Sequence, residues 1–368
     1  MKNNVAIIHD WLNGMRGGEK VLEVLLDIFP EADIFTLFLE PENISDKINA
    51  HTIFPSTLNK YKFIRNHYKY FLPLFPAAVE EFNLKNYDIV ISSSHCVAKG
   101  VIPHPGSLHI SYIHSPMRYV WDRYYAYFGN IKGLKKLYIR QQVSKLRNWD
   151  IASASRVDYF IANSHFIRER IRRYYRRDAA VIHPPVDTEG FQPISNPKKD
   201  YFLTVSALVP YKENHLLVDA FNRTGDPLII VGKGPEEKKL KKRAKKNIIF
   251  KKNIPERELV GLYQDAAAFA FAGVEDFGIA FVEAQACGVP VLAYKKGGVL
   301  DIVSEETGVL FETQDIEDIV QAIEKIKKNK FDPSIIRQNS LKFSRENFKN
   351  NFERFFEDVV EKVKQEKA

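Results

Sequence analysis

The sequence alternates short apolar runs with amphipathic helical patterns along most of its length, and this alternation restricts the possible folds more than any other feature. Residues 5–10 (VAIIHD) are typical of a buried strand, and residues 19–29 (EKVLEVLLDIF) place their apolar side chains on one helical stripe. Later apolar runs end in small polar residues, as parallel strands do where they lead into a binding loop. We therefore expect an α/β protein with doubly wound parallel sheets, covered by helices on both faces.

A proline-rich passage divides the alternating pattern into two sets. Residues 181–200 carry four prolines and no helical period, which is typical of an interdomain linker. A length of 368 residues also suits two domains. The end of the chain carries phenylalanine and valine at helical spacing. The predicted division is 1–185, 186–345 and a C-terminal amphipathic helix over 346–368.

Composition excludes several classes of protein. The two cysteines, Cys96 and Cys287, cannot form a disulfide scaffold, and their surroundings do not suggest a metal site. His9 and Asp10 fall where the apolar region of a secretory leader would continue, and no run approaches the ~20 apolar residues of a membrane span. We expect a cytoplasmic protein.

The positive charge of the chain is concentrated in one block. The formal net charge is +8, and residues 60–177 hold 21 Lys and Arg against 7 Asp and Glu, a local balance of +14. Such a block attracts polyanions, which could be nucleic acid, an anionic membrane or phosphate-bearing substrates. Charge alone does not decide between these partners.

Residues 275–298 (EDFGIAFVEAQACGVPVLAYKKGG) carry the most informative pattern. An apolar strand ends just before Glu275, and a helix begins near Gly278. The N–H groups of Gly278, Ile279 and Ala280 would then be first-turn donors, which form an anion site at the end of the strand. A carboxylate repels phosphate, so Glu275 and Glu283 are better suited to accept hydrogen bonds from hydroxyl groups.

At these residues the sequence resembles the glycosyltransferases with the GT-B fold, and specifically glycosyltransferase family 4. The residues that meet the family signature are Glu275, Glu283, Ala284, Ala286, Gly288, Pro290 and Val291. The resemblance implies two Rossmann-like domains that face each other across a cleft, with the C-terminal helix crossing back to the N-terminal domain. It assigns Glu283 to the nucleotide ribose and Glu275 to hydroxyls of the transferred sugar.

Residues 204–221 resemble the first strand and loop of the family's C-terminal domain. Lys212 falls on the lysine that holds the donor diphosphate, whereas Ala207 occupies the position of an expected arginine. Gly232 and Gly234 match the strand-end glycine turn of this fold, although such glycines can also serve only to shape a turn.

The N-terminal half supplies two further matches. Gly17 and Gly18 lie after the first strand and directly before a helix, where glycine allows a ligand to approach the backbone closely. His114 ends a strand in the place of the family's active-site histidine. The predicted catalytic residues are His114, Lys212 and Glu275. The predicted donor-binding residues are Gly17, Gly18, Gly232, Gly234, Asp276, Phe277, Gly278, Ile279, Ala280 and Glu283.

Four segments resemble the WbaZ-like branch of the family, mannosyltransferases of surface-polysaccharide assembly: HDWLNGMRGGEKVLE, SSSHCVAKGV, YIHSPMRYVWD and VIHPPVD. This resemblance implies a retaining hexosyltransferase that moves mannose from GDP-mannose to a glycan or a polyprenyl-diphosphate-linked saccharide, with no metal and no other cofactor. A UDP-sugar-dependent transferase of the same family and a sugar-nucleotide epimerase, which shares the fold, are the alternatives. A nucleic-acid-binding protein is disfavoured, because no recognised binding motif accompanies the basic block.

Two basic amphipathic segments suggest peripheral contact with the anionic inner face of the cell membrane. They are residues 131–149 and residues 166–177, and each suits a helix that lies on an anionic leaflet. The alternative is a solvated helix face on which arginine stems cover apolar surface. The predicted membrane-surface residues are Arg170, Arg172, Arg173, Arg176 and Arg177.

Overall fold

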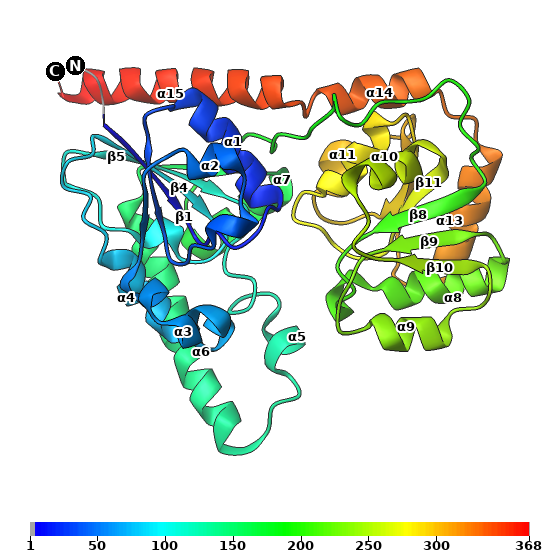
Figure 1. Ribbon diagram of the computed structural model, residues 1–368, viewed down its shortest axis with the longest axis horizontal. Coiled ribbons are helices and arrows are strands. Elements are labelled where there is room, and N and C mark those ends of the chain that lie inside the picture. Colours follow the sequence, from blue (N-terminus) through cyan, green and yellow to red (C-terminus); the bar gives the residue numbers. More distant parts are fainter. Residues whose placement is uncertain (1–3, 368) are drawn as a thin grey trace. The chain divides into compact units, whose positions relative to one another are not determined.

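The computed structural model describes residues 4–367 and divides the chain into two compact units (Figure 1). Unit 1 comprises the chain up to His183 together with the part from Lys349 onward, and unit 2 runs from Pro184 to Phe348. These limits lie within three residues of the predicted boundaries. Among the described residues, no helix has the length and hydropathy needed to cross a membrane.

Unit 1 is built on a seven-stranded sheet in which every pairing is parallel. The strand order is β3-β2-β1-β4-β5-β6-β7. The strands are β1 (Val5–His9), β2 (Asp33–Thr36), β3 (Ile53–Pro55), β4 (Ile89–Ser94), β5 (Leu108–Ile113), β6 (Tyr159–Ala162) and β7 (Ala180–Val181). The helices are α1 (Gly17–Ile28), α2 (Asp46–Asn49), α3 (Lys62–Asn66), α4 (Phe75–Glu80), α5 (Tyr124–Phe128), α6 (Gly133–Ser153), α7 (His165–Tyr175) and α15 (Arg345–Lys367).

Helices pack their apolar faces against this sheet because its strands are buried on both sides. Helix α6 contributes Val143 and Leu146 to a core cluster that includes Ile8 and Val90 of the sheet. Helix α7 begins after Ser164, whose hydroxyl group caps it by accepting a hydrogen bond from the Ile167 N–H at 3.1 Å.

The predicted return of the C-terminal helix to the N-terminal domain is confirmed. In α15, Phe352 is buried, and its ring centroid lies 6.2 Å from that of Phe29, at the end of α1. Phe356, one turn later, lies 5.2 Å from the same ring. Phe352 and Phe356 of the predicted apolar stripe therefore pack against the end of α1, while Phe355 contacts Tyr159 of β6.

Unit 2 contains a six-stranded parallel sheet with the order β10-β9-β8-β11-β12-β13. Its strands are β8 (Tyr201–Val205), β9 (Leu228–Val231), β10 (Ile248–Lys251), β11 (Ala266–Phe271), β12 (Val291–Tyr294) and β13 (Gly308–Phe311). Its helices are α8 (Asn214–Thr224), α9 (Glu237–Arg243), α10 (Glu256–Gln264), α11 (Ile279–Ala286), α12 (Val299–Ile302), α13 (Ile316–Lys328) and α14 (Pro333–Leu341).

The proline-rich passage belongs mostly to unit 2 and is not a free linker. Val186 and Phe191 are buried, and the Val186 N–H donates to the Phe343 carbonyl at 2.9 Å. The chain passes from unit 1 to unit 2 between His183 and Pro184, inside the predicted range of 181–200, and the part just after this point packs on unit 2. Proline removes helical period without preventing an extended chain from packing on a domain.

Both sheets reverse their strand order at one point, which is where ligands bind in open α/β sheets. In unit 1 this switch point lies between β1 and β4, and in unit 2 it lies between β8 and β11. The residues that follow these four strands include most of the predicted site residues.

Candidate active site

The loop between β11 and α11 has the strand–loop–helix form predicted from its sequence. Helix α11 begins at Ile279, and the preceding Gly278 has φ of +109°. A Cβ atom at Gly278 would lie 2.3 Å from the Phe281 ring, so this position requires glycine for both its conformation and its packing. The first N–H groups of α11 have no acceptor within the helix, as at every helix start.

Two glycines from the next strand–helix connection hold this loop in place. The Gly298 N–H donates to the Glu275 carbonyl at 2.9 Å, and Gly297 forms a parallel bridge with Glu275. A Cβ atom at Gly298 would lie 2.3 Å from the Phe277 backbone. The sequence pattern included these glycines, but their role in fixing the backbone of Glu275 was not predicted.

Lys212 and Glu275 form an ion pair through Nζ and Oε1. Lys212 is almost buried, and it ends a short 3₁₀ turn (Pro210–Lys212) that follows β8. A Cβ atom at Gly273 would lie 2.9 Å from the Lys212 carbonyl oxygen, so glycine at the end of β11 permits the close approach of the two loops. The predicted diphosphate and sugar residues are thus in direct contact.

Glu283 is held by a residue that the sequence analysis missed. The hydroxyl group of Tyr263 in α10 donates a hydrogen bond to Glu283 Oε2 at 3.0 Å. Tyr263 is fully buried, and desolvation, together with the charge and hydrogen bond of Glu283, raises the pKa of its phenol well above the usual value. Tyr263 therefore remains a donor and orients the carboxylate. In the sequence, Tyr263 stands among apolar residues at helical spacing, which indicated only a core residue.

Gly232 and Gly234 bring the end of β9 against the loop that follows β8. A Cβ atom at Gly232 would lie 1.9 Å from the Ser206 carbonyl oxygen, and one at Gly234 would lie 2.2 Å from the Leu208 carbonyl oxygen. These glycines therefore shape the turn, and a donor-binding role remains a prediction. Lys233, between them, accepts a backbone bond from Leu208 at 3.0 Å, next to Ala207.

In unit 1 the ends of β1, β4 and β5 bring two histidines onto one hydroxyl. Ser93 Oγ lies 3.1 Å from His9 Nδ1 and 2.8 Å from His114 Nε2. His9 and Ser93 are buried. A single hydroxyl proton can be donated to only one of the two rings, so the other ring must donate to Ser93. The protonation of His114 is therefore coupled to that of His9.

Glu19 lies on the opposite side of the His9 ring from Ser93. Its Oε1 is 3.8 Å from His9 Nε2, and its Oε2 accepts the Arg16 N–H at 2.9 Å. Burial acts to raise the pKa of Glu19, but the interaction with His9 and a backbone hydrogen bond lower it to about 2. The Glu19 carboxylate therefore faces the buried His9 ring, whose Nε2 has no hydrogen-bond partner among the described residues.

Gly18, in the first turn of α1, lies against both rings. A Cβ atom at Gly18 would be 3.3 Å from His9 Cε1 and 3.7 Å from His114 Nε2. Gly17 is the first residue of the helix. The structure thus brings Gly17, Gly18 and His114 together in unit 1, while the other predicted site residues lie in unit 2.

Asp10 fixes the loop after β4 that carries the neighbouring His95. Its two carboxylate oxygens accept the backbone N–H groups of His95, Cys96, Val97 and Ala98 at 2.6–2.9 Å. Asp10 is buried, and the charge-assisted bonds compensate for its desolvation. In the sequence, the position of Asp10 argued only against a leader peptide, and its role in this loop was not predicted.

The predicted membrane surface on α7 requires correction. The Arg170 side chain is buried, pairs with Asp122 and donates to Ser115 Oγ at 3.2 Å. The apolar face of α7 lies in the core of unit 1, with Ile167, Ile171 and Tyr175 buried. The prediction is therefore wrong for Arg170, because the periodicity marks an apolar face without showing what covers it.

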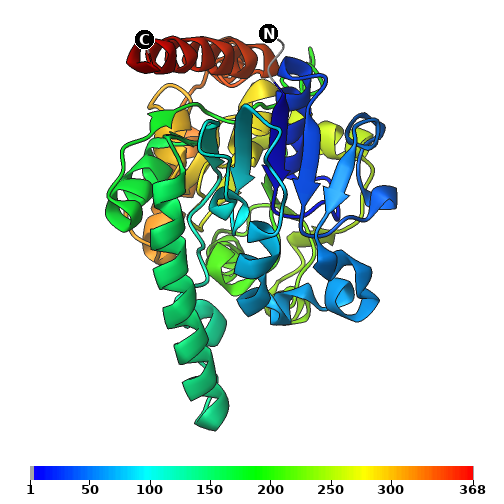
Figure 2. The same ribbon diagram turned by 90° about the vertical axis from the view of Figure 1, so that its left-hand side faces the viewer.

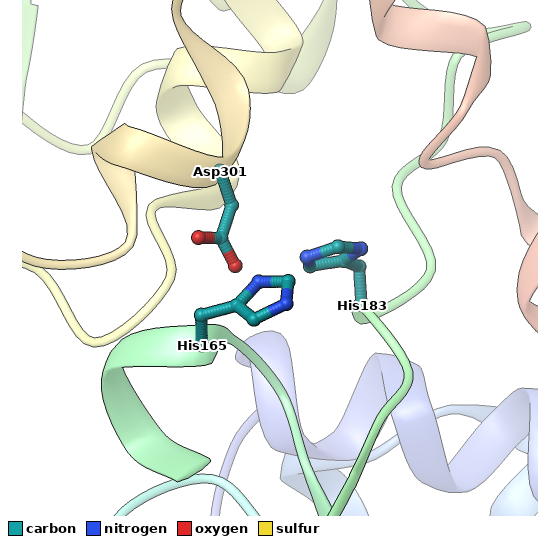
Figure 3. A group of neighbouring side chains, drawn as sticks. All are labelled: His165, His183 and Asp301. Atoms are coloured by element: carbon teal, nitrogen blue, oxygen red, sulfur yellow. The ribbon is translucent and has the colours of Figure 1, made fainter. Parts of the chain in front are cut away.

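The remaining arginines of this set differ in exposure. Arg172, Arg173 and Arg176 are exposed, whereas Arg177 is partly buried and donates to the Asp158 carbonyl at 2.8 Å. Figure 3 shows His165, at the start of α7, beside His183, with 6.2 Å between ring centroids. Asp301, also drawn there, belongs to α12 of unit 2, and we assign no metal site to these residues.

Two parallel α/β units of this topology, each with predicted site residues at the carboxyl edge of its sheet, define a GT-B glycosyltransferase fold. The family description "Glycosyltransferase Family 4" matches residues 31–190, and "Glycosyl transferases group 1" matches residues 185–343. The chain belongs to glycosyltransferase family 4.

Curated relatives include several transferases of activated mannose and related sugars. A GDP-mannose-dependent alpha-(1-6)-phosphatidylinositol monomannoside mannosyltransferase of Mycolicibacterium smegmatis is 31% identical over 192 residues, 44% of this chain and 50% of the relative. The D-rhamnosyltransferase WbpZ of Pseudomonas aeruginosa is 28% identical over 159 residues, 38% of this chain and 42% of the relative. The chain thus spans about half the length of the curated relatives it matches.

Solved structures share the fold over nearly the whole chain. Anabaena Alr3699/HepE in complex with UDP-glucose has a TM-score of 0.70 at 15% identity, with 96% of this chain and 99% of that chain covered. The lipopolysaccharide outer core galactosyltransferase WaaB has a TM-score of 0.68 at 19% identity, with 96% and 99% covered.

Proposed function

We propose that this chain is a retaining glycosyltransferase that moves mannose from GDP-mannose to a glycan or lipid-linked saccharide in surface-polysaccharide assembly. The observation that carries the proposal is the contact between Lys212 and Glu275. In a nucleotide sugar the diphosphate is bonded directly to the sugar. A cationic side chain that binds the phosphate and a hydrogen-bond acceptor that binds sugar hydroxyls must therefore lie next to each other. This pair meets that requirement at the switch point of unit 2.

The same site supplies fixed positive groups for the leaving diphosphate. The ammonium group of Lys212 and the first N–H groups of α11, those of Ile279 and Ala280, are placed by packed backbone. Preorganised donors of this kind stabilise developing charge without reorganisation. We therefore propose transfer without a metal ion, in which the leaving phosphate helps to remove the proton of the acceptor hydroxyl.

His114 is the proposed sugar-side residue of unit 1. It lies at the carboxyl edge of the sheet of unit 1, with Nε2 2.8 Å from Ser93 Oγ. An imidazole nitrogen can bind a sugar hydroxyl. This assignment explains why two buried polar residues support one histidine.

Relatives support GDP-mannose more than they support a UDP-sugar. Two curated relatives are GDP-mannose-dependent by name, with 31% identity over 192 and 134 residues. The solved neighbours with UDP or UDP-glucose are at 14–15% identity, which shows the fold alone. A UDP-sugar-dependent transferase is therefore the second candidate.

Thermal-shift measurements against GDP, UDP, ADP and their sugars test the donor. A ligand at 100 times its Kd stabilises the folded state by about 2.7 kcal/mol, so the true nucleotide should give the largest shift. The Glu283→Gln variant is expected to reduce the shift for every nucleotide, because it weakens the contact proposed for the ribose. A larger shift with UDP than with GDP would reject GDP-mannose.

Incubation with the donor alone separates a transferase from an epimerase. A transferase leaves the sugar configuration of GDP-mannose unchanged when no acceptor is present, although slow hydrolysis can occur. Nuclear magnetic resonance of the anomeric proton detects any change of the sugar. Conversion of GDP-mannose to another GDP-sugar would contradict the proposed function.

A further inference from the structure

Exposed apolar side chains are concentrated in two segments of unit 1, which we call the basic–aromatic patch. The segments are residues 61–74 and 125–138. Together they hold nine of the seventeen large apolar side chains that are exposed among the described residues. The nine are Tyr61, Phe63, Tyr70, Leu74, Tyr125, Tyr127, Leu134, Leu137 and Tyr138. Single exposed apolar residues are ordinary, but such a concentration marks an interaction surface.

Helix α6 shows most clearly that the described residues leave part of this surface uncovered. Its buried residues are Val143, Leu146, Asp150 and Ser153, all in its second half. In the first half, Leu134 is 86% exposed and Leu137 is 63% exposed. In both views this half extends beyond the sheet of unit 1 (Figures 1 and 2). An apolar stripe on a helix that contacts nothing is costly in water unless something covers it.

The charges of the patch are all positive. Each segment contains three basic residues and neither contains Asp or Glu. The six are Lys62, Arg65, Lys69, Lys132, Lys135 and Lys136. None of them forms an ion pair with another described residue. In contrast, the basic run at α9 is partly neutralised, because Lys239 and Lys241 pair with Glu236 and Glu237.

Both segments leave the sheet of unit 1 at the same edge. Residues 61–74 follow β3 and residues 125–138 follow β5, and all strands are parallel, so both segments start from the carboxyl edge. His114 is the first residue after β5 and lies at that edge. Their inner side chains also share one core cluster, to which Tyr68 and Phe71 contribute from one segment and Phe128 from the other.

We propose that the basic–aromatic patch docks the protein on an anionic lipid bilayer. Tyrosine and phenylalanine insert at the headgroup boundary, and lysine stems extend along it with their ammonium groups towards lipid phosphates. Unpaired cations without any acid match a negative surface, whereas a second copy of the same patch would bring like charges together. Docking is assigned to residues 61–74 and 125–138 in place of α7.

Flotation with lipid vesicles tests the proposal in the absence of donor and acceptor, so its result does not depend on the proposed function. Wild-type protein should float with vesicles of phosphatidylglycerol and phosphatidylcholine at low salt, and much less with phosphatidylcholine alone. The charge variant Lys132→Gln, Lys135→Gln, Lys136→Gln should weaken binding roughly tenfold or more. The apolar variant Tyr70→Ser, Leu134→Ser, Leu137→Ser should weaken it comparably.

Matched controls use exposed residues of unit 2. The variant Lys238→Gln, Lys242→Gln, Lys246→Gln removes the same charge, and Ile249→Ser with Ile335→Ser removes exposed apolar groups. Both should float like wild type. Equal losses in patch and control variants, or a larger loss on changing Arg172, Arg173 and Arg176 to Gln, would overturn the proposal. So would a concentration-dependent dimer that the patch variants dissociate in the absence of any vesicle binding.

Discussion

At the residue scale, the pair formed by Lys212 and Glu275 links binding to chemistry. In the structure the two side chains form an ion pair with each other. In the proposed function a bound donor replaces this contact, with phosphate at Lys212 and sugar at Glu275. The loss of each residue should therefore have a different effect.

Replacing these two residues should separate nucleotide affinity from turnover. We expect Lys212→Gln to weaken GDP binding roughly tenfold or more, since it removes the cation that faces the phosphates. Glu275→Gln should keep or strengthen GDP binding, because it frees Lys212, and should lower kcat. Calorimetric titration with GDP and turnover measurements check both. Lys295→Gln, at the exposed pair with Glu312, is the control and should change neither. Unaltered GDP affinity in Lys212→Gln would mean that the phosphate site lies elsewhere.

Glu19 should contribute stability that depends on pH. Its pKa of about 2 lies below the usual value of 4.5, so this contribution is complete above pH 4.5 and is lost as the pH falls towards 2. Glu19→Gln should cost roughly 3 kcal/mol at pH 7 and progressively less below pH 4.5. Denaturant unfolding followed by tryptophan fluorescence reports this, since Trp11, Trp121 and Trp149 all lie in unit 1. Glu23→Gln, one turn later in α1, is the control. An identical acid dependence for Glu19→Gln and wild type would contradict this role.

At the scale of elements, one carboxylate anchors a loop. Asp10 supplies four acceptor contacts to residues 95–98, and an amide side chain can supply only part of them. Asp10→Asn should destabilise unit 1 by about 3 kcal/mol and disturb the contact between Trp11 and His95, whose ring centroids lie 4.4 Å apart. The fluorescence midpoint and emission maximum measure both effects. Asp178→Asn, at an exposed pair with Arg168, should shift the midpoint by less than ~1 kcal/mol. Similar midpoints for the two variants would argue against the anchor.

The start of α11 should depend on glycine at position 278. Gly278→Ala places a methyl group against the Phe281 ring at a positive φ, so we expect a loss of about 2 kcal/mol and weaker GDP binding. Gly261→Ala is a matched control, because it lies in α10 with open space around its Cβ position. That change should be neutral or should stabilise unit 2 by about 0.5–1 kcal/mol. Calorimetric melting compares the two variants, and equal stabilities would show that the turn tolerates a side chain.

At the scale of the whole molecule, the sequence predicted those features that are repeated or local. The strands, their parallel direction and the start of the helix after Gly278 follow from hydrophobic periodicity and from the backbone freedom of glycine within short segments. Contacts between distant segments left no local signal. The hydrogen bond from Tyr263 to Glu283 and the series of polar contacts from Glu19 to His114 depend on which segments the fold brings together. The burial of Arg170 could not be predicted for the same reason.

Unit 1 is assembled from two stretches of chain that are separated by the whole of unit 2. The Phe29 surface of α1 is covered by Phe352 and Phe356, which leave a ribosome only after all of residues 184–348. During synthesis, the apolar surface around Phe29 therefore remains uncovered while residues 184–348 are made. The order of synthesis thus places the completion of the first domain after that of the second.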